Sequence, residues 1–121
     1  MRAHVAHIRN MNAPTPFPRN IDDKVAFDRK ELNVILGLYG RMVAAGEWRD
    51  YGMSFLKDVA VFAVFRRAAE NPLYRIEKRP ALARKQGAFV VVSMTGAVLK
   101  RGHDLGQVLK VFDRQKLKLA T

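Results

Sequence analysis

The most distinctive residues of this chain are its basic side chains, which are numerous and clustered. The 121 residues include 22 Lys and Arg against 11 Asp and Glu, and residues 66–101 hold nine basic and two acidic residues, a local charge of +7. A field of this sign favours anionic partners such as nucleic acid, acidic protein surfaces or phospholipid headgroups. A charge excess that serves only solubility is the alternative. The residues that we select as anion contacts, with nucleic acid first, are Lys78, Arg79, Arg84, Lys85, Lys100 and Arg101.

The chain offers few catalytic or metal-binding side chains. It has no cysteine, which excludes disulfides and thiolate zinc sites. His4 and His7 have the spacing of two metal ligands on a helix, but no third ligand is near. No glycine-rich phosphate loop, nucleophile elbow or matched carboxylate pair is visible; the residues considered for the last two are Ser54, Ser93, Glu70 and Glu77. We therefore expect a non-enzymatic protein without cofactor or metal.

Two short segments have side chains that allow more than one interpretation. Trp48, Arg49 and Tyr51 are of the types enriched at interface hot spots, although a single tryptophan is more often a core residue that closes a helix–sheet junction. His103 and Asp104 precede the last predicted helix, where they could help to hold an anion, but the interpretation that we favour is a helix cap. An enzyme of unfamiliar type would need Arg49, Tyr51, His103 and Asp104 in one pocket.

The first element that must position these residues is a helix over residues 29–45. Asp28 and Glu31 have the spacing of a capping box, and Gly46 is a usual helix end. The expected core-facing stripe consists of Leu32, Ile35, Leu36, Tyr39 and Val43. A further set, Val34, Leu38 and Met42, widens the stripe beyond what one sheet contact needs. This width suggests a homodimeric structural or regulatory protein, with Leu38 in the partner face, as the alternative function.

Five strands and a second helix are expected after the first helix. Residues 59–65 are apolar on both faces and predict a central strand, with a short helix as the alternative. Apolar residues at 105, 108, 109 and 112 predict the last helix, and 116–119 could add an edge strand. The predicted strands are 51–55, 59–65, 74–78, 89–94 and 97–101.

The simplest assembly is an α+β fold: a helix, a five-stranded antiparallel meander and a C-terminal helix, with both helices on one face of the sheet. In a meander, the ends of strands one, three and five lie beside the starts of strands two and four. This arrangement brings Lys57 and the six selected cations to one end of the sheet. Residues 24–121 form the single domain, and residues 1–23, with three prolines, form a flexible tail.

The longest apolar run, Val59 to Phe65, is too short to span a bilayer. No apolar core of a secretory signal follows Arg2. We expect a cytoplasmic protein with no membrane span.

Residues 27–119 resemble a small bacterial family known as domain of unknown function 2794. The resemblance is carried by residues 27–32, 39–51, 72–80 and 100–105, which read FDRKEL, YGRMVAAGEWRDY, PLYRIEKRP and KRGHDL. It implies a bacterial protein and a single domain, and it brings no activity, cofactor or site residue with it.

Overall fold

The computed structural model describes residues 23–67 and 71–113. Its elements are α2 (Arg29–Ala44), β1 (Asp50–Phe55), β2 (Ala60–Phe65), β3 (Tyr74–Lys78), the 3-10 turn η2 (Pro80–Leu82), β4 (Phe89–Ser93), β5 (Val98–Gly102) and α3 (Leu105–Val108). This order confirms the predicted α+β fold. The predicted strand at 116–119, and the predicted tail apart from Asp23, lie outside the described residues.

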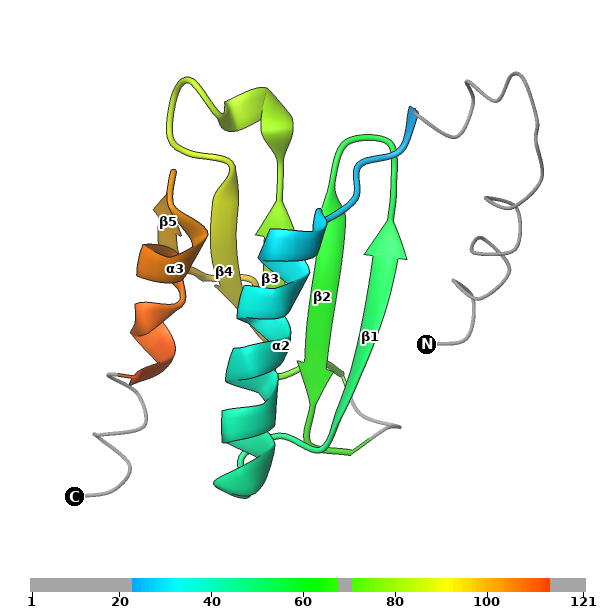
Figure 1. Ribbon diagram of the computed structural model, residues 1–121, viewed down its shortest axis with the longest axis vertical. Helices are drawn as coiled ribbons and strands as arrows, with labels where there is room; N and C mark the ends of the chain where they lie inside the picture. Colours follow the sequence, from blue (N-terminus) through cyan, green and yellow to red (C-terminus); the bar gives the residue numbers. More distant parts are fainter. Residues whose placement is uncertain (1–22, 68–70, 114–121) are drawn as a thin grey trace.

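The sheet is an antiparallel meander in the order β1-β2-β3-β4-β5. Residues 60–65 are a central strand, so the helical alternative for this segment is wrong. Both α2 and α3 lie on the same side of the sheet, with α2 in front of its middle strands and α3 beside β4 and β5 (Figure 1). One row of residues is in register across all five strands: Phe55, Ala60, Lys78, Phe89 and Gly102.

The N-terminus of α2 is formed by the predicted capping box. The Glu31 amide donates to Asp28 Oδ1 and the Asp28 amide donates to Glu31 Oε1, both at 2.8 Å. Two amides that have no partner within the helix are satisfied in this way. The helix ends at Ala44, and Gly46 follows with a φ of +80°.

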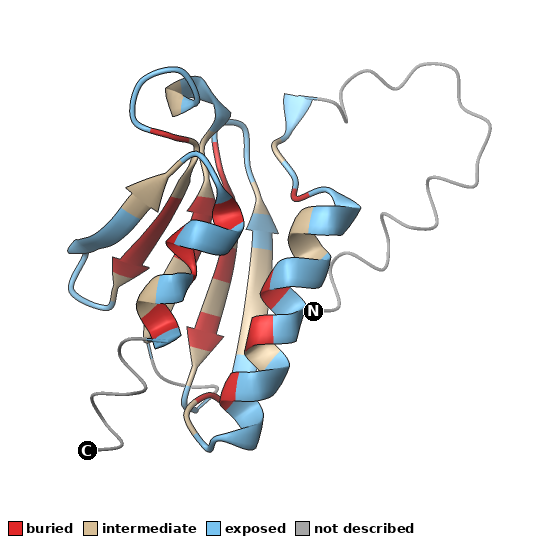
Figure 2. Cartoon of the chain, turned by 60° about the vertical axis from the view of Figure 1, so that its left-hand side comes forward, coloured by how far each residue is buried: buried red, intermediate tan, exposed pale blue. Residues whose placement is uncertain are grey.

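The core lies between the helices and one face of the sheet, and Figure 2 shows buried positions on both helices and on the strands beside them. α2 contributes Ile35, Leu38 and Met42 to this core. The predicted stripe was therefore wrong in part, because Leu36 and Val43 are 38% and 41% exposed. Leu38 and Met42 are 2% and 6% exposed, so assigning them to the partner face was wrong, whereas Val34 from the same set is 44% exposed. Apolar residues occupy so much of the circumference of α2 that periodicity alone did not show which side meets the sheet.

Trp48 is an interior residue at the junction between α2 and the sheet, with 2% exposure. Its ring meets Phe112 edge-on at a centroid distance of 5.1 Å, and Tyr39 and Tyr74 lie at 6.2 and 6.4 Å. This position confirms the core interpretation of the tryptophan. The interpretation of Trp48 as an interface residue is wrong, because the aromatic rings around it leave almost none of its surface exposed to a partner.

Candidate nucleic-acid interface

The register places cationic residues from separate segments at one end of the sheet, as the meander predicts. The turn between β1 and β2, the segment between β3 and β4, and the end of β5 all lie at this end. Lys57, Arg84 and Lys85 are exposed there. We define the basic end by its residues Lys57, Arg79, Arg84, Lys85 and Arg101.

The segment that carries Arg84 and Lys85 is a hydrogen-bonded loop. The Arg79 amide donates to the Ala88 carbonyl at 2.7 Å and closes the loop at its base. The Leu82 carbonyl accepts from the amides of residues 85, 86 and 87 at 2.9–3.1 Å. Gly87 has a φ of +103°, and its Cα packs against the backbone of Gly102. The loop is thereby held against the end of β5.

Lys78 does not belong to the surface for which it was predicted. Its ammonium donates to the Ala26 carbonyl at 2.9 Å and pairs with Glu31 Oε1 at 2.8 Å, and its side chain is 19% exposed. Because successive strand residues point to opposite faces, Lys78 lies on the helix side of β3 and connects the start of α2 to the sheet. These contacts occupy the charge that we had assigned to an anion.

The same alternation separates Lys100 from Arg101. Arg101 is opposite Val90, which is opposite Glu77, on the face that α2 and α3 leave uncovered. Lys100 is opposite Val91, a core residue, so it lies on the other side of the sheet, where it is exposed at the edge. Lys100 is therefore not part of the basic end.

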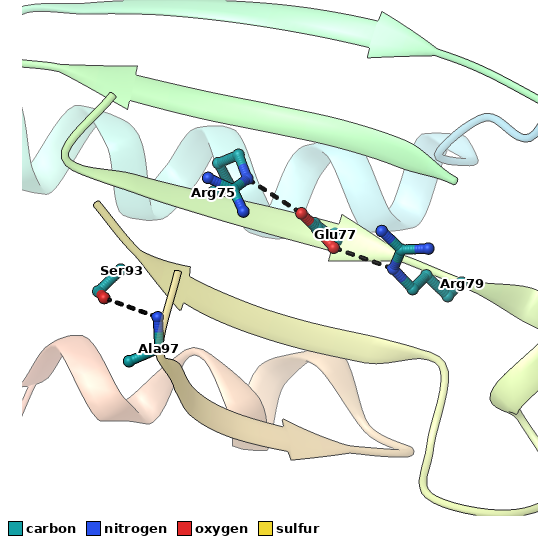
Figure 3. Close-up of polar contacts among 5 residues, drawn as sticks. All are labelled: Arg75, Glu77, Arg79, Ser93 and Ala97. Carbon is teal, nitrogen blue, oxygen red and sulfur yellow. Dashed lines mark hydrogen bonds and ion pairs between the residues drawn. The ribbon is translucent and has the colours of Figure 1, made fainter. Parts of the chain in front are cut away.

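A charged row runs along β3 on the uncovered face. Glu77, with 5% exposure, accepts from Arg75 Nε at 3.1 Å through one oxygen and from Arg79 Nε at 3.0 Å through the other. Figure 3 shows this row on the side of the strand away from α2. The two arginine side chains keep 35% and 40% exposure. Both guanidinium groups are thus oriented by one carboxylate and still reach solvent.

Arg101 has a buried nitrogen without an acceptor. Its Nη1 atom is removed from solvent and has no hydrogen-bond partner in the part of the chain that the structure describes. Glu77 is committed to Arg75 and Arg79, and no ion pair of Arg101 is found among the described residues. A buried donor without a partner costs about 1–3 kcal/mol. Arg101 as a whole is partly exposed, so a change of its side-chain rotamer would present the guanidinium to an anion, which would supply the missing acceptor.

Sequence reasoning missed three further cations near the basic end. Lys24, Arg29 and Lys30 are exposed at the start of α2. The Val25 amide donates to the Leu56 carbonyl at 2.8 Å, and Lys78 binds Ala26, so this segment lies beside the turn between β1 and β2. The signal was absent from the local sequence because both contacts join segments far apart in the chain.

The remaining candidate residues do not form one site. Asp104 caps α3 by accepting from the Gln107 amide at 2.9 Å, which confirms the cap, and His103 beside it is exposed. Arg49 is exposed next to the start of β1, whereas His103 follows the end of β5. These positions are at opposite edges and opposite ends of the meander. Arg49 and Tyr51 therefore do not share a pocket with His103 and Asp104, as an enzyme of unfamiliar type would need.

Tyr51 lies in β1 on the face of the sheet that α2 covers. Its ring stacks on Phe62 at 4.7 Å and meets Tyr39 edge-on at 4.9 Å. Burial, with smaller contributions from Asp50 and Tyr51, raises the pKa of the Tyr39 hydroxyl above its ordinary value of 10.0. These ring contacts make Tyr51 mainly a packing residue, although it keeps partial exposure.

A groove of about 330 Å³ separates α2 from the segment that begins with α3. Its walls combine apolar and charged groups, and it lies on the helix side, away from the charged row. The lining residues are Asn33, Val34, Gly37, Leu38, Arg41, Gly106, Leu109, Lys110 and Asp113.

Residues 23–67 and 71–113 lack two further kinds of feature. No helix there has the length and apolar character to cross a membrane. No group of three or more His, Cys, Asp or Glu side chains there could hold a metal ion. His4, His7 and Glu70 lie outside these residues.

The described residues form a small α+β domain whose meander has one face covered by α2 and α3 and a second, charged face that these two helices leave uncovered. On this second face Glu77, Val90 and Val92 are nevertheless buried, whereas the side chains of β1 and β2 are partly or fully exposed. The chain belongs to the family described as "Protein of unknown function (DUF2794)", which matches residues 25–109. No curated protein and no solved structure matches the chain.

Proposed function

We propose that this domain is a non-enzymatic binding module that contacts nucleic acid through the basic end. The observation that carries the proposal is the register of the five strands, which gathers cations from three separate segments at one end of the sheet. Each Lys or Arg that neutralises a phosphate releases counterions, so several cations within one surface add to the affinity. A cytoplasmic location in a bacterium belongs to the same proposal, because nucleic acid is met there.

The distribution of the cations favours a polyanion over an acidic protein partner. Arg84 and Lys85 are in the loop, Lys57 is in a turn two strands away, and Lys24 is beside that turn. A nucleic-acid backbone presents regularly repeated charges that can contact such spread positions at the same time. Phosphate contacts of this kind position a protein and do not read the base sequence. We therefore expect binding with little sequence preference.

The test replaces both Arg84 and Lys85 with alanine and measures binding to mixed DNA and RNA over a range of salt concentrations. Both side chains are exposed, so the free energy of unfolding should change by no more than about 0.5 kcal/mol. The slope of log affinity against log salt should become shallower by about 1.4 to 1.8, the value for two lost phosphate contacts on single or double strands.

The matched control replaces Arg66 and Arg67 with alanine. These are two exposed cations that follow β2 at the opposite end of the sheet. This variant has the same net charge as the first. Equal losses in the two variants would show that net charge, and not the basic end, drives binding. If the wild-type protein shows no salt-dependent binding near physiological ionic strength, the proposal fails.

A homodimeric structural or regulatory protein is the second candidate, and the groove between α2 and α3 is the observation that favours it. Val34, 44% exposed, and Leu38, 2% exposed, both line this groove. Sedimentation of the pure protein at high micromolar concentration, with and without nucleic acid, separates the two candidates. A monomer that sediments faster only with nucleic acid excludes the dimer.

A further inference from the structure

The uncovered face of the sheet has an area without charged side chains beside the charged row. We define the shelf as the uncharged residues of β1 and β2 that face this side: Gly52, Ser54, Val61, Ala63 and Phe65. The three β2 residues are partly exposed and do not pack against the core. A Cβ built at Gly52 would meet no atom within 4 Å. The shelf is therefore accessible to solvent and largely apolar.

Cations border the shelf on the side of β3. Arg75 is directly opposite Ala63, and Arg79 follows β3 on the same face. Arg101, with its unpartnered buried nitrogen, lies two strands further along the row of Glu77. Acidic groups on this face are Glu77, whose two oxygens are occupied, and Asp50 beside Phe65, whose carboxylate accepts from the Tyr51 amide at 3.0 Å. The bordered face is thus complementary to a strand that presents negative phosphates and the aromatic faces of its bases.

We infer that the uncovered face binds single-stranded nucleic acid, with bases on the shelf and a backbone phosphate on Arg101. This inference rests on the proposed function and adds the form of the nucleic acid and the surface that selects it. Stacking on aromatic rings and on guanidinium planes is available to unpaired bases, and Phe65, Arg75 and Arg79 offer such planes.

The width of the sheet argues against a duplex on this face. Five strands with spacings of about 4.8 Å make a face about 19 Å wide. The major groove of a DNA duplex is about 12 Å wide and admits a helix or a two-stranded ribbon. A five-stranded face is too wide to enter this groove, whereas a single strand can lie across it.

The experiment compares fluorescence anisotropy of a labelled single strand of mixed sequence, about 12 nucleotides long, with that of a duplex of the same sequence. The first variant is Gly52→Gln, which covers part of the shelf without changing charge. The second is Arg101→Gln, which removes the orphan guanidinium. The control is Lys110→Gln, which removes an exposed cation on the helix side. Circular dichroism establishes that each variant is folded.

We expect the single strand to bind more tightly than the duplex. Gly52→Gln should weaken single-strand binding at least about fivefold, the lower range for loss of one stacked base. Arg101→Gln should weaken it about tenfold or more, as for a lost hydrogen bond to a charged group. The salt slope for Arg101→Gln should fall by about 0.7. Lys110→Gln should bind as the wild type does.

Other results separate this inference from the proposed function. If Gly52→Gln and Arg101→Gln bind the single strand as the wild type does, while the Arg84 and Lys85 variant is weakened, the open-face inference is overturned and the proposed function stands. Tighter binding of the duplex than of the single strand would likewise overturn the inference about the uncovered face and leave the proposed function standing. If no nucleic acid binds the wild type, both fail. Should Arg101→Gln unfold, Gly52→Gln decides, because its added side chain meets open space.

Discussion

Gly87→Ala should destabilise the domain strongly because two independent costs meet at this residue. The loop between β3 and β4 returns to the sheet at Gly87, where φ is +103°. A Cβ there would overlap the carbonyl carbon and oxygen of Gly102 and lie 2.7 Å from its Cα. All three atoms belong to the backbone of Gly102 and not to a flexible side chain, so β5 or the whole loop must move to relieve the overlap.

The magnitude follows from the two costs. A residue with a Cβ in a rarely populated backbone conformation costs about 1–3 kcal/mol. Overpacking against neighbours that cannot change rotamer costs about another 1–3 kcal/mol. Their sum, about 2–6 kcal/mol, is a large part of the 5–15 kcal/mol that is typical of a domain.

Gly96→Ala is the matched control for this prediction. Gly96 has a similar φ of +94°, but a Cβ there would meet nothing within 4 Å, so only the conformational cost applies. Urea unfolding followed by circular dichroism gives both free energies of unfolding. We expect Gly87→Ala to be less stable than Gly96→Ala by about 1–3 kcal/mol. Equal values for the two variants would refute the close approach of Gly87 to Gly102 and, with it, the packing of the loop against the end of β5.

Three further predictions concern the core and the charged groups. Leu38→Glu should unfold the chain, because it places a carboxylate at a position with 2% exposure, whereas Val34→Glu should stay folded; far-UV circular dichroism distinguishes these outcomes. Glu77→Ala should lower the free energy of unfolding by about 1–3 kcal/mol, measured in urea, since two oriented guanidinium groups lose their acceptor; an unchanged stability would mean that water replaces Glu77 fully. Burial raises the pKa of Tyr39 and of Tyr74 above 10.0, so their contribution to stability is complete below pH 10.0 and is lost as the pH rises through the folded-state values. As the pH is raised, tyrosinate absorbance should therefore appear at a higher pH in the folded protein than in the protein unfolded in urea. Identical titration curves would contradict the burial of these hydroxyls.

The elements of the fold could be predicted because their signals are local. Asp28 and Glu31 form the capping box from residues three apart, and the alternation of Tyr74, Ile76 and Lys78 with Arg75 and Glu77 marks β3. Short connections between antiparallel strands then leave the meander as the simplest order. From that order alone, the end of the sheet that gathers Lys57, Arg79, Arg84, Lys85 and Arg101 follows.

The partners of individual charges could not be predicted in the same way. Lys78 was grouped with its neighbour Arg79, but its ammonium binds Glu31, which is 47 residues away in the chain. Recognising this pair requires knowing which side of the sheet α2 covers and how α2 is rotated. The apolar residues Val34, Leu36 and Val43 obscured that rotation, because a helix that is apolar on several sides has no unique face.

The charged residues of β3 have a second effect, which determines where binding can be tested cleanly. A shift of β3 by one residue would turn Arg75, Glu77 and Arg79 toward the core and Ile76 toward solvent. The buried Glu77 and its two arginines therefore oppose such a shift, and substitutions among them would alter register and binding together. Arg101 lies on an edge strand and makes no ion pair among the described residues, and Gly52 lies on the other edge strand beside open space. Loss of binding at these two positions with an unchanged fold would therefore be evidence about the nucleic-acid interface itself.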